Sequence, residues 1–102
     1  MKKIIFFLLF PLYILSQSSF SGTIKDSSGY PIMGANIIAV NNETQILDGF
    51  GISNDNGYFS LNLKKDTEFN IKITFIGYKP IELNISLSED LVKDFILEEQ
   101  AE

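Results

Sequence analysis

The chain of 102 residues contains no histidine, no cysteine and no tryptophan. Without histidine and cysteine it cannot build a Ser-His-Asp triad, a Cys-His pair or the usual zinc sites. Most hydrolase mechanisms are therefore excluded. The lack of cysteine also means that no disulfide holds the fold, so one hydrophobic core must stabilise it.

Basic residues are also scarce, since eight Lys and Arg stand against thirteen Asp and Glu. Lys2 and Lys3 lie in a leader-like first segment, and without them six basic residues against thirteen acidic ones give a formal charge of −7. Nucleic acid is not expected as a partner, because binding to phosphates depends on positive charge.

Long hydrophobic runs are equally few. The run 4–15 is twelve residues long and interrupted by Pro11, whereas a membrane-spanning helix needs about 20 apolar residues. Lysines precede this run and the small residue Ser16 follows it, which is the pattern of a secretory signal peptide. We expect residues 1–16 to be cleaved and the rest, without a membrane span, to be exported to the periplasm or the periplasmic face of the outer membrane. An uncleaved signal anchor is the alternative.

The remaining sequence alternates between apolar and polar residues, and no stretch of it shows helical periodicity over three turns. This pattern predicts an all-β fold, and several short strands in one small domain favour a β-sandwich. The seven strands expected are Phe20–Ile24, Ala35–Val40, Gly49–Ser53, Tyr58–Leu63, Phe69–Phe75, Ile81–Leu87 and Leu91–Leu97.

One side of each alternating run is assigned to the core. The core residues predicted in this way are Ile24, Ala35, Ile37, Ala39, Phe59, Leu61, Ile71, Ile73, Leu83, Ile85, Phe95 and Leu97. The opposite side leaves a candidate apolar-aromatic surface for a partner, made of Tyr30, Ile38, Val40, Tyr58 and Tyr78. The alternative is that these are ordinary single exposed side chains.

Turn residues separate the strands. Asp26 is expected to accept hydrogen bonds from backbone groups a few residues on, with Gly29 at positive φ. The segment 54–57, Asn-Asp-Asn-Gly, predicts a tight hairpin between the third and fourth strands, with Gly57 at positive φ. A further turn or bulge is expected around Gly77, because the alternation breaks there.

The carboxylates and the turn at 54–56 are the candidate chemical sites. The acidic residues fall in expected loops among turn residues, which favours a structural role over acid–base catalysis. They are Asp26, Asp48, Asp55, Asp66, Glu89 and Asp90. The turn at 54–56 lacks the closing Glu of a helix-flanked calcium loop. We therefore expect no catalytic, cofactor-binding or metal-ligating residue and no cofactor.

Three blocks carry a resemblance: Phe20–Ile38, Ser53–Leu61 and Thr74–Lys79, in this order. Together, over about residues 19 to 98, they resemble the carboxypeptidase-regulatory-like domain. The resemblance implies a seven-stranded prealbumin-like (transthyretin-like) β-sandwich of Greek-key type. Such domains often stand at the mature N-terminus of TonB-dependent outer-membrane receptors of Bacteroidetes-type bacteria, ahead of the plug and barrel.

The resemblance also implies a function: a non-catalytic accessory or interaction domain of an outer-membrane TonB-dependent uptake receptor, with receptor or TonB-system components as partners. Because the sequence to Glu102 holds neither plug nor barrel, it is either a front fragment or truncated copy of a receptor, or a free-standing secreted copy. The alternative function is a stand-alone secreted binding module for glycan or protein. The expected division is signal peptide 1–16, sandwich domain 17–98, and the start of a polar linker or tail at 99–102.

Overall fold

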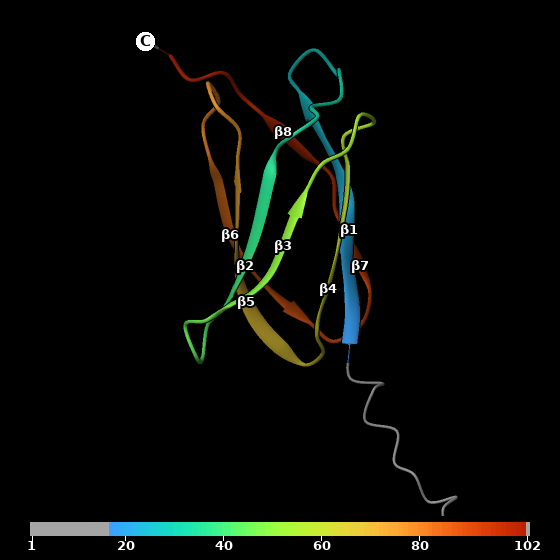
Figure 1. Ribbon diagram of the computed structural model, residues 1–102, viewed down its shortest axis with the longest axis vertical. Helices are drawn as coiled ribbons and strands as arrows, with labels where there is room; N and C mark the ends of the chain where they lie inside the picture. The colour runs from blue at the N-terminus through green and yellow to red at the C-terminus, as the bar shows by residue number, and fades with distance from the viewer. Residues whose placement is uncertain (1–16, 102) are drawn as a thin grey trace, which may run out of the picture.

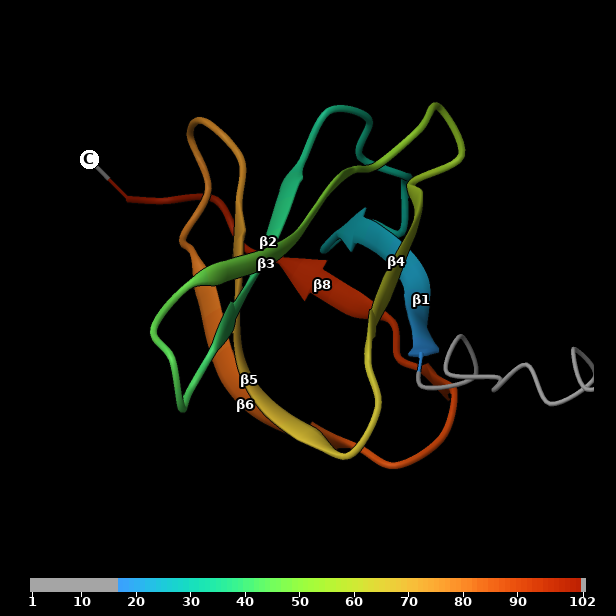
Figure 2. The same cartoon turned by 60° about the horizontal axis from the view of Figure 1, so that its bottom comes forward.

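The computed structural model describes residues 17–101, and the expected signal peptide lies outside this range. Its regular elements are strands: β1 (Gln17–Asp26), β2 (Asn36–Asn41), β3 (Leu47–Ile52), β4 (Tyr58–Lys64), β5 (Thr67–Thr74), β6 (Ile81–Leu87), β7 (Leu91–Val92) and β8 (Phe95–Leu97). They form two layers (Figures 1 and 2). Within the described range no helix is long and apolar enough to cross a membrane. The predicted all-β sandwich is confirmed.

The first sheet is built around β1, and the second has the order β3-β2-β5-β6. Strand β1 pairs with β4 in the antiparallel sense and with both β7 and β8 in the parallel sense. All neighbours in the second sheet are antiparallel. The chain therefore crosses between the sheets after β1, β3, β4 and β6. These crossings place the two apolar faces against each other.

The expected seventh strand is divided into β7 and β8, which follow β1 one after the other. The break falls at Lys93 and Asp94, where the chain comes so close to β1 that a Cβ on Gly22 would overlap the carbonyl oxygen of Lys93. At the break, the Asp94 carboxylate replaces a backbone acceptor and takes hydrogen bonds from the N–H and hydroxyl of Thr23, both at 3.0 Å.

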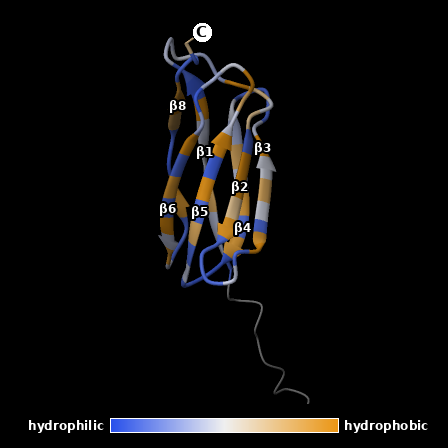
Figure 3. Cartoon of the chain, turned by 90° about the vertical axis from the view of Figure 1, so that its left-hand side faces the viewer, coloured by the Kyte–Doolittle hydropathy of each residue, from blue (hydrophilic) through white to orange (hydrophobic). Residues whose placement is uncertain are grey.

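The core lies between the sheets and follows the predicted alternation. The described residues include sixteen buried apolar side chains: Phe20, Ile24, Ile32, Ala35, Ile37, Ala39, Phe59, Leu61, Leu63, Phe69, Ile71, Ile73, Ile85, Leu87, Phe95 and Leu97. Figure 3 shows the alternation of apolar and polar positions along the strands. Every predicted core residue is buried except Leu83, which is only half-buried and packs against the core from β6.

The predicted hairpin between β3 and β4 is wrong. The turn 54–57 exists and Gly57 has the expected positive φ of 77°, but β3 pairs with β2 and β4 pairs with β1, so the turn carries the chain from one sheet to the other. The glycines of β3 show why. The Cβ of an alanine at Gly49 or Gly51 would lie 2.5 Å from Leu63 or 3.0 Å from Leu61. Strand β3 therefore packs on the side chains of β4 instead of hydrogen-bonding beside it.

Candidate interaction surface

The second sheet turns an apolar row outward, away from the first sheet. Strand β2 contributes Ile38 and Val40, and β3 contributes Leu47, Phe50 and Ile52. In the register of the two strands, Ile38 lies opposite Phe50 and Val40 opposite Leu47. The three β3 side chains are 54–55% exposed, whereas the two on β2 are half-buried. We call these five residues the apolar row.

Only the β2 half of the apolar row, Ile38 and Val40, was predicted from the sequence. Phe50 and Ile52 were not singled out, although the Gly-Phe-Gly-Ile pattern places both glycines on one side of the strand and both large side chains on the other. Asp48 was expected in a loop but lies in β3. There the register shifts, and its carboxylate accepts a hydrogen bond of 3.1 Å from the side-chain amide of Asn41.

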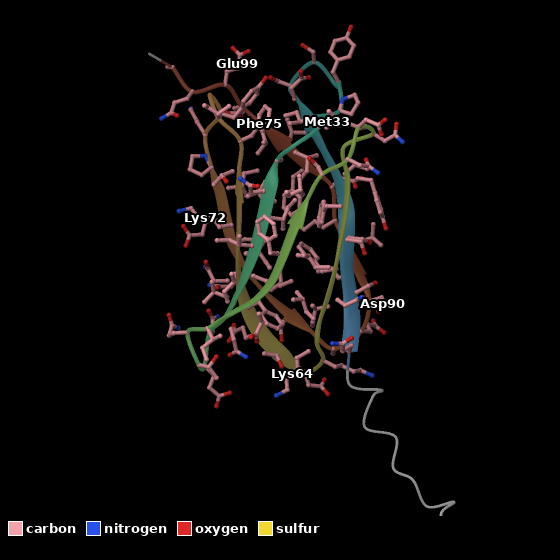
Figure 4. The ribbon with its side chains drawn as sticks, in the orientation of Figure 1. Met33, Lys64, Lys72, Phe75, Asp90 and Glu99 are labelled. Atoms are coloured by element: carbon pink, nitrogen blue, oxygen red, sulfur yellow. The ribbon has the colours of Figure 1, made fainter. Side chains whose placement is uncertain are left out.

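Further from β3, the same face becomes polar. The side-chain oxygen of Asn84 on β6 lies 3.3 Å from the amide nitrogens of both Asn42 and Asn70. Lys72 on β5 lies opposite both Ile38 and Glu82 and is exposed, as Figure 4 shows. The apolar row is therefore confined to the β2–β3 side of the sheet.

The three tyrosines that were predicted to join this surface lie elsewhere. Tyr30 and Tyr58 are 69% and 45% exposed and follow the two turns at one end of the sandwich. Tyr78 is half-buried and packs on Phe75, with ring centroids 5.6 Å apart. The predicted surface is thus not one patch, because the turns carry the tyrosines to the end of the strands.

Two of these turns have the same architecture. In each, a side-chain oxygen accepts 2.9 Å hydrogen bonds from the N–H groups two and four residues on: Asp26 in the first turn and Asn54 in the second. Gly29 and Gly57 occupy equivalent places at positive φ. The second turn is tied to β1 just before the first turn begins, since the N–H of Ile24 donates to the carbonyl of Gly57 at 2.7 Å. The two turns hold this end of the sandwich together.

Several carboxylates have identifiable structural partners. Asp90 accepts a hydrogen bond of 2.9 Å from the N–H of Ser19, as Asp94 does from Thr23, so both carboxylates bind backbone N–H groups of β1 beside the short strands β7 and β8. Asp26 closes its own turn. Among residues 17–101, no group of three or more acidic residues is arranged to hold a metal ion.

The surface of residues 17–101 includes two shallow pockets. The first, of about 330 Å³, is lined by Asn41, Asn42, Glu43, Asp66, Thr67 and Glu68. The second, of about 360 Å³, lies beside β3 and β4 and is lined by Gln17, Asp48, Asn62 and Lys64. Both are lined by polar residue types and are open to solvent.

The polar C-terminal stretch does not leave the sandwich at once. The N–H of Lys79 donates to Glu98 O at 2.8 Å, and the N–H of Gln100 donates to Gly77 O at 2.9 Å. The exposed side chains of Lys79 and Glu98 lie 3.8 Å apart. The backbone thus follows the fold to Gln100, and the boundary drawn at residue 98 stays a prediction.

Two packed sheets, with the last strand divided into β7 and β8 along β1, define a β-sandwich domain. Residues 20–102 match the CarboxypepD_reg-like domain, and the chain belongs to that family. The expected family is therefore confirmed.

Similar proteins set this domain in context. Over 76 residues, 74% of the chain, it is 30% identical to the TonB-dependent receptor SusC of Bacteroides thetaiotaomicron, of which the match spans 7%. Among solved structures, 3-chlorocatechol 1,2-dioxygenase from Rhodococcus opacus 1CP superposes with a TM-score of 0.66 at 11% identity, over 83% of this chain and 61% of that one. The shaft pilin SpaA from Lactobacillus rhamnosus GG gives 0.64 at 12%, over 85% and 47%. At these identities the two structures share the fold alone.

Proposed function

We propose that this chain is a non-catalytic interaction domain of a TonB-dependent outer-membrane uptake receptor, exported to the periplasmic side of that membrane. Its membership of the CarboxypepD_reg-like family, together with 30% identity to the receptor SusC, carries the proposal. Since the chain spans only 7% of SusC, the uptake activity of a whole receptor would lie in other parts of such a protein.

The positions of the acidic groups support a role in contact over one in chemistry. A general acid–base pair needs two carboxyl groups directed at a common reacting centre. In this domain Asp26 closes a turn, and Asp90 and Asp94 bind backbone N–H groups of β1. The apolar row, in contrast, exposes large side chains on a regular sheet, which is the composition of a docking surface.

An affinity experiment tests this proposal. The chain is immobilised and exposed to detergent-solubilised outer membranes of the source organism, and bound proteins are quantified by mass spectrometry. A TonB-dependent receptor or a TonB-system component should be enriched over a bead control. In parallel, the chain should hydrolyse no peptide or glycan substrate. Saturable binding to a soluble polysaccharide, with no enriched membrane protein, would contradict the proposal and favour a secreted binding module.

A further inference from the structure

Strand β3 is the edge of the sandwich with the least protection against pairing with another chain. Natural sheets protect their edges with proline, lysine, breaks or very short strands. Strand β6 follows Pro80 and exposes Glu82, β4 exposes Lys64, and β7 and β8 are two and three residues long. In β3 the charge of Asp48 and the register shift lie at its first residues, and the regular stretch from Gly49 to Ile52 carries neither a charge nor a proline. Figure 3 shows β3 at the right-hand edge of its sheet.

The open hydrogen-bonding groups of β3 belong to Phe50 and Ile52. The N–H of Ser53 donates to Ala35 O at 3.0 Å, so the backbone of Ser53 faces the β2 side. Because alternate residues of an antiparallel strand face its partner, the two glycines of β3 also face β2, and Phe50 and Ile52 face away. Strand β3 pairs with β2 alone, which leaves these N–H and C=O groups open to a further strand. We call this the β3 edge.

The apolar row indicates which side chains an added strand would need on the outer face. Phe50 and Ile52 are 54% and 55% exposed on the outer face, directly above the β3 edge. Residues i and i+2 of an added strand would stand beside them on the same face. Apolar side chains at those two positions would cover Phe50 and Ile52 and extend the row that begins at Ile38.

The intervening residues of the added strand would point to the other face, beside β4. The open pocket lined by Gln17, Asp48, Asn62 and Lys64 lies between the start of β3 and β4, and the inward-facing residues of β3 after Asp48 are glycines. A long polar side chain fits this space. Since the chain from Gln17 onward carries a formal charge of −7, from six basic and thirteen acidic residues, complementarity favours a basic segment.

We propose that the β3 edge binds an extended basic segment of a partner protein by strand addition, with apolar side chains at alternating positions and Lys or Arg between them. Main-chain hydrogen bonds would provide the affinity and the alternating side chains the specificity. A second copy of the chain fits less well, because it would bring a glycine to the polar pocket and the same negative charge. The biological setting of this segment rests on the proposed function, but its binding is tested without any receptor component.

The test uses residues 17–102, which include all described core side chains, and the peptide acetyl-Thr-Lys-Val-Lys-Val-Lys-Thr-amide. Binding is followed by NMR titration of the labelled protein and by amide hydrogen exchange. We expect saturable binding with Kd below about 1 mM and slower exchange at the amides of Phe50 and Ile52. A peptide N-methylated at both valines, which cannot complete the ladder, and one with Glu in place of Lys should each bind at least about tenfold more weakly.

Matched protein variants locate the site. Phe50→Lys should weaken peptide binding at least about tenfold, and Ile52→Lys should do the same. Ile96→Lys, at a side chain on β8 that is 60% exposed, should leave it unchanged. All three positions are exposed, so circular dichroism should show folded proteins. The absence of saturable binding, equal binding of the N-methylated peptide, or protection confined to β6 or β8 would overturn the proposal. Protection of the β3 edge that rises with protein concentration alone would assign it to a second copy and overturn it as well.

Discussion

Replacing Phe59 with alanine should remove a large part of the stability of this domain. Phe59 is 2% exposed, lies on β4 and contacts two other aromatic rings of the core. Its centroid is 5.3 Å from that of Phe20, in an edge-to-face arrangement, and 6.3 Å from that of Phe95. The ring therefore links β1, β4 and β8, the three strands that hold the first sheet together.

The magnitude follows from this packing. A Phe→Ala change in a core costs about 3 to 5 kcal/mol. The two aromatic contacts, at about 0.5 to 1.5 kcal/mol each, place Phe59→Ala in the upper part of that range. For a domain whose total stability is about 5 to 10 kcal/mol, the variant stays folded only marginally.

Urea denaturation followed by circular dichroism measures the effect. With a slope of about 1.5 kcal/mol per molar urea, a loss of about 4 kcal/mol lowers the midpoint by about 3 M. Phe50→Ala is the matched control, because it removes the same atoms from a side chain that is 54% exposed, and it should cost less than about 1 kcal/mol. Equal losses in the two variants, or a Phe59→Ala midpoint within about 0.5 M of wild type, would refute this account of the core.

Three further outcomes are expected. Gly57→Val should destabilise by about 2 to 4 kcal/mol in thermal or urea unfolding, because φ is 77° and the new Cβ would lie 2.5 Å from a backbone oxygen. Gly29→Val, at φ 91° with nothing within 4 Å of the new Cβ, should cost only about 1 to 2 kcal/mol, and equal costs would contradict the role of the close contact. Gly22→Ala should displace the break between β7 and β8, since its Cβ would overlap Lys93 O; unchanged hydrogen exchange at Lys93 would count against this. Finally, mass spectrometry of the protein recovered from the periplasm should show cleavage near Ser16, whereas an intact Met1 in a membrane fraction would favour an anchor.

The sequence predicts best the strands that have one buried and one exposed face. The limits of β6 were predicted as they are observed, Ile81–Leu87, and β4 extends the expected strand only to Lys64. In both strands alternate side chains are buried, so the apolar pattern of the sequence specifies which side chains face the core. Strand β1 shows the limit of this signal. It begins at Gln17, three residues before the predicted start at Phe20, because residues 17–19 pair with β4 through backbone groups and carry no apolar pattern.

Sheet membership could not be predicted from local pattern. The turn 54–57 has the composition of a hairpin, yet the strands on either side belong to different sheets. What decides between the two arrangements is the packing of Gly49 and Gly51 on Leu63 and Leu61, which is a contact between sheets. Local turn chemistry explains the positive φ of Gly57 but does not determine which strands pair.

The candidate surface was half predicted for a similar reason. Alternation in β2 turned Ile38 and Val40 outward, and the structure confirms their side of the sheet. The three tyrosines were predicted to join this surface from their residue type alone. They lie at turns at the ends of the strands, whereas Ile38 and Val40 lie within β2. The openness of the β3 edge depends on which strands flank it, so it became visible only with the topology.

The central claim, that this is an interaction domain of an outer-membrane receptor, is tested most directly by locating the domain in cells. An antibody raised against residues 17–102 is used on fractionated cells of the source organism, after chemical crosslinking and without it. The account predicts that the antigen lies in the outer-membrane fraction, either within a receptor-sized protein or crosslinked to one. Antigen recovered wholly as a free protein of about the size of the 11.5 kDa chain in the soluble fraction or the medium, with no crosslinked membrane protein, would contradict it.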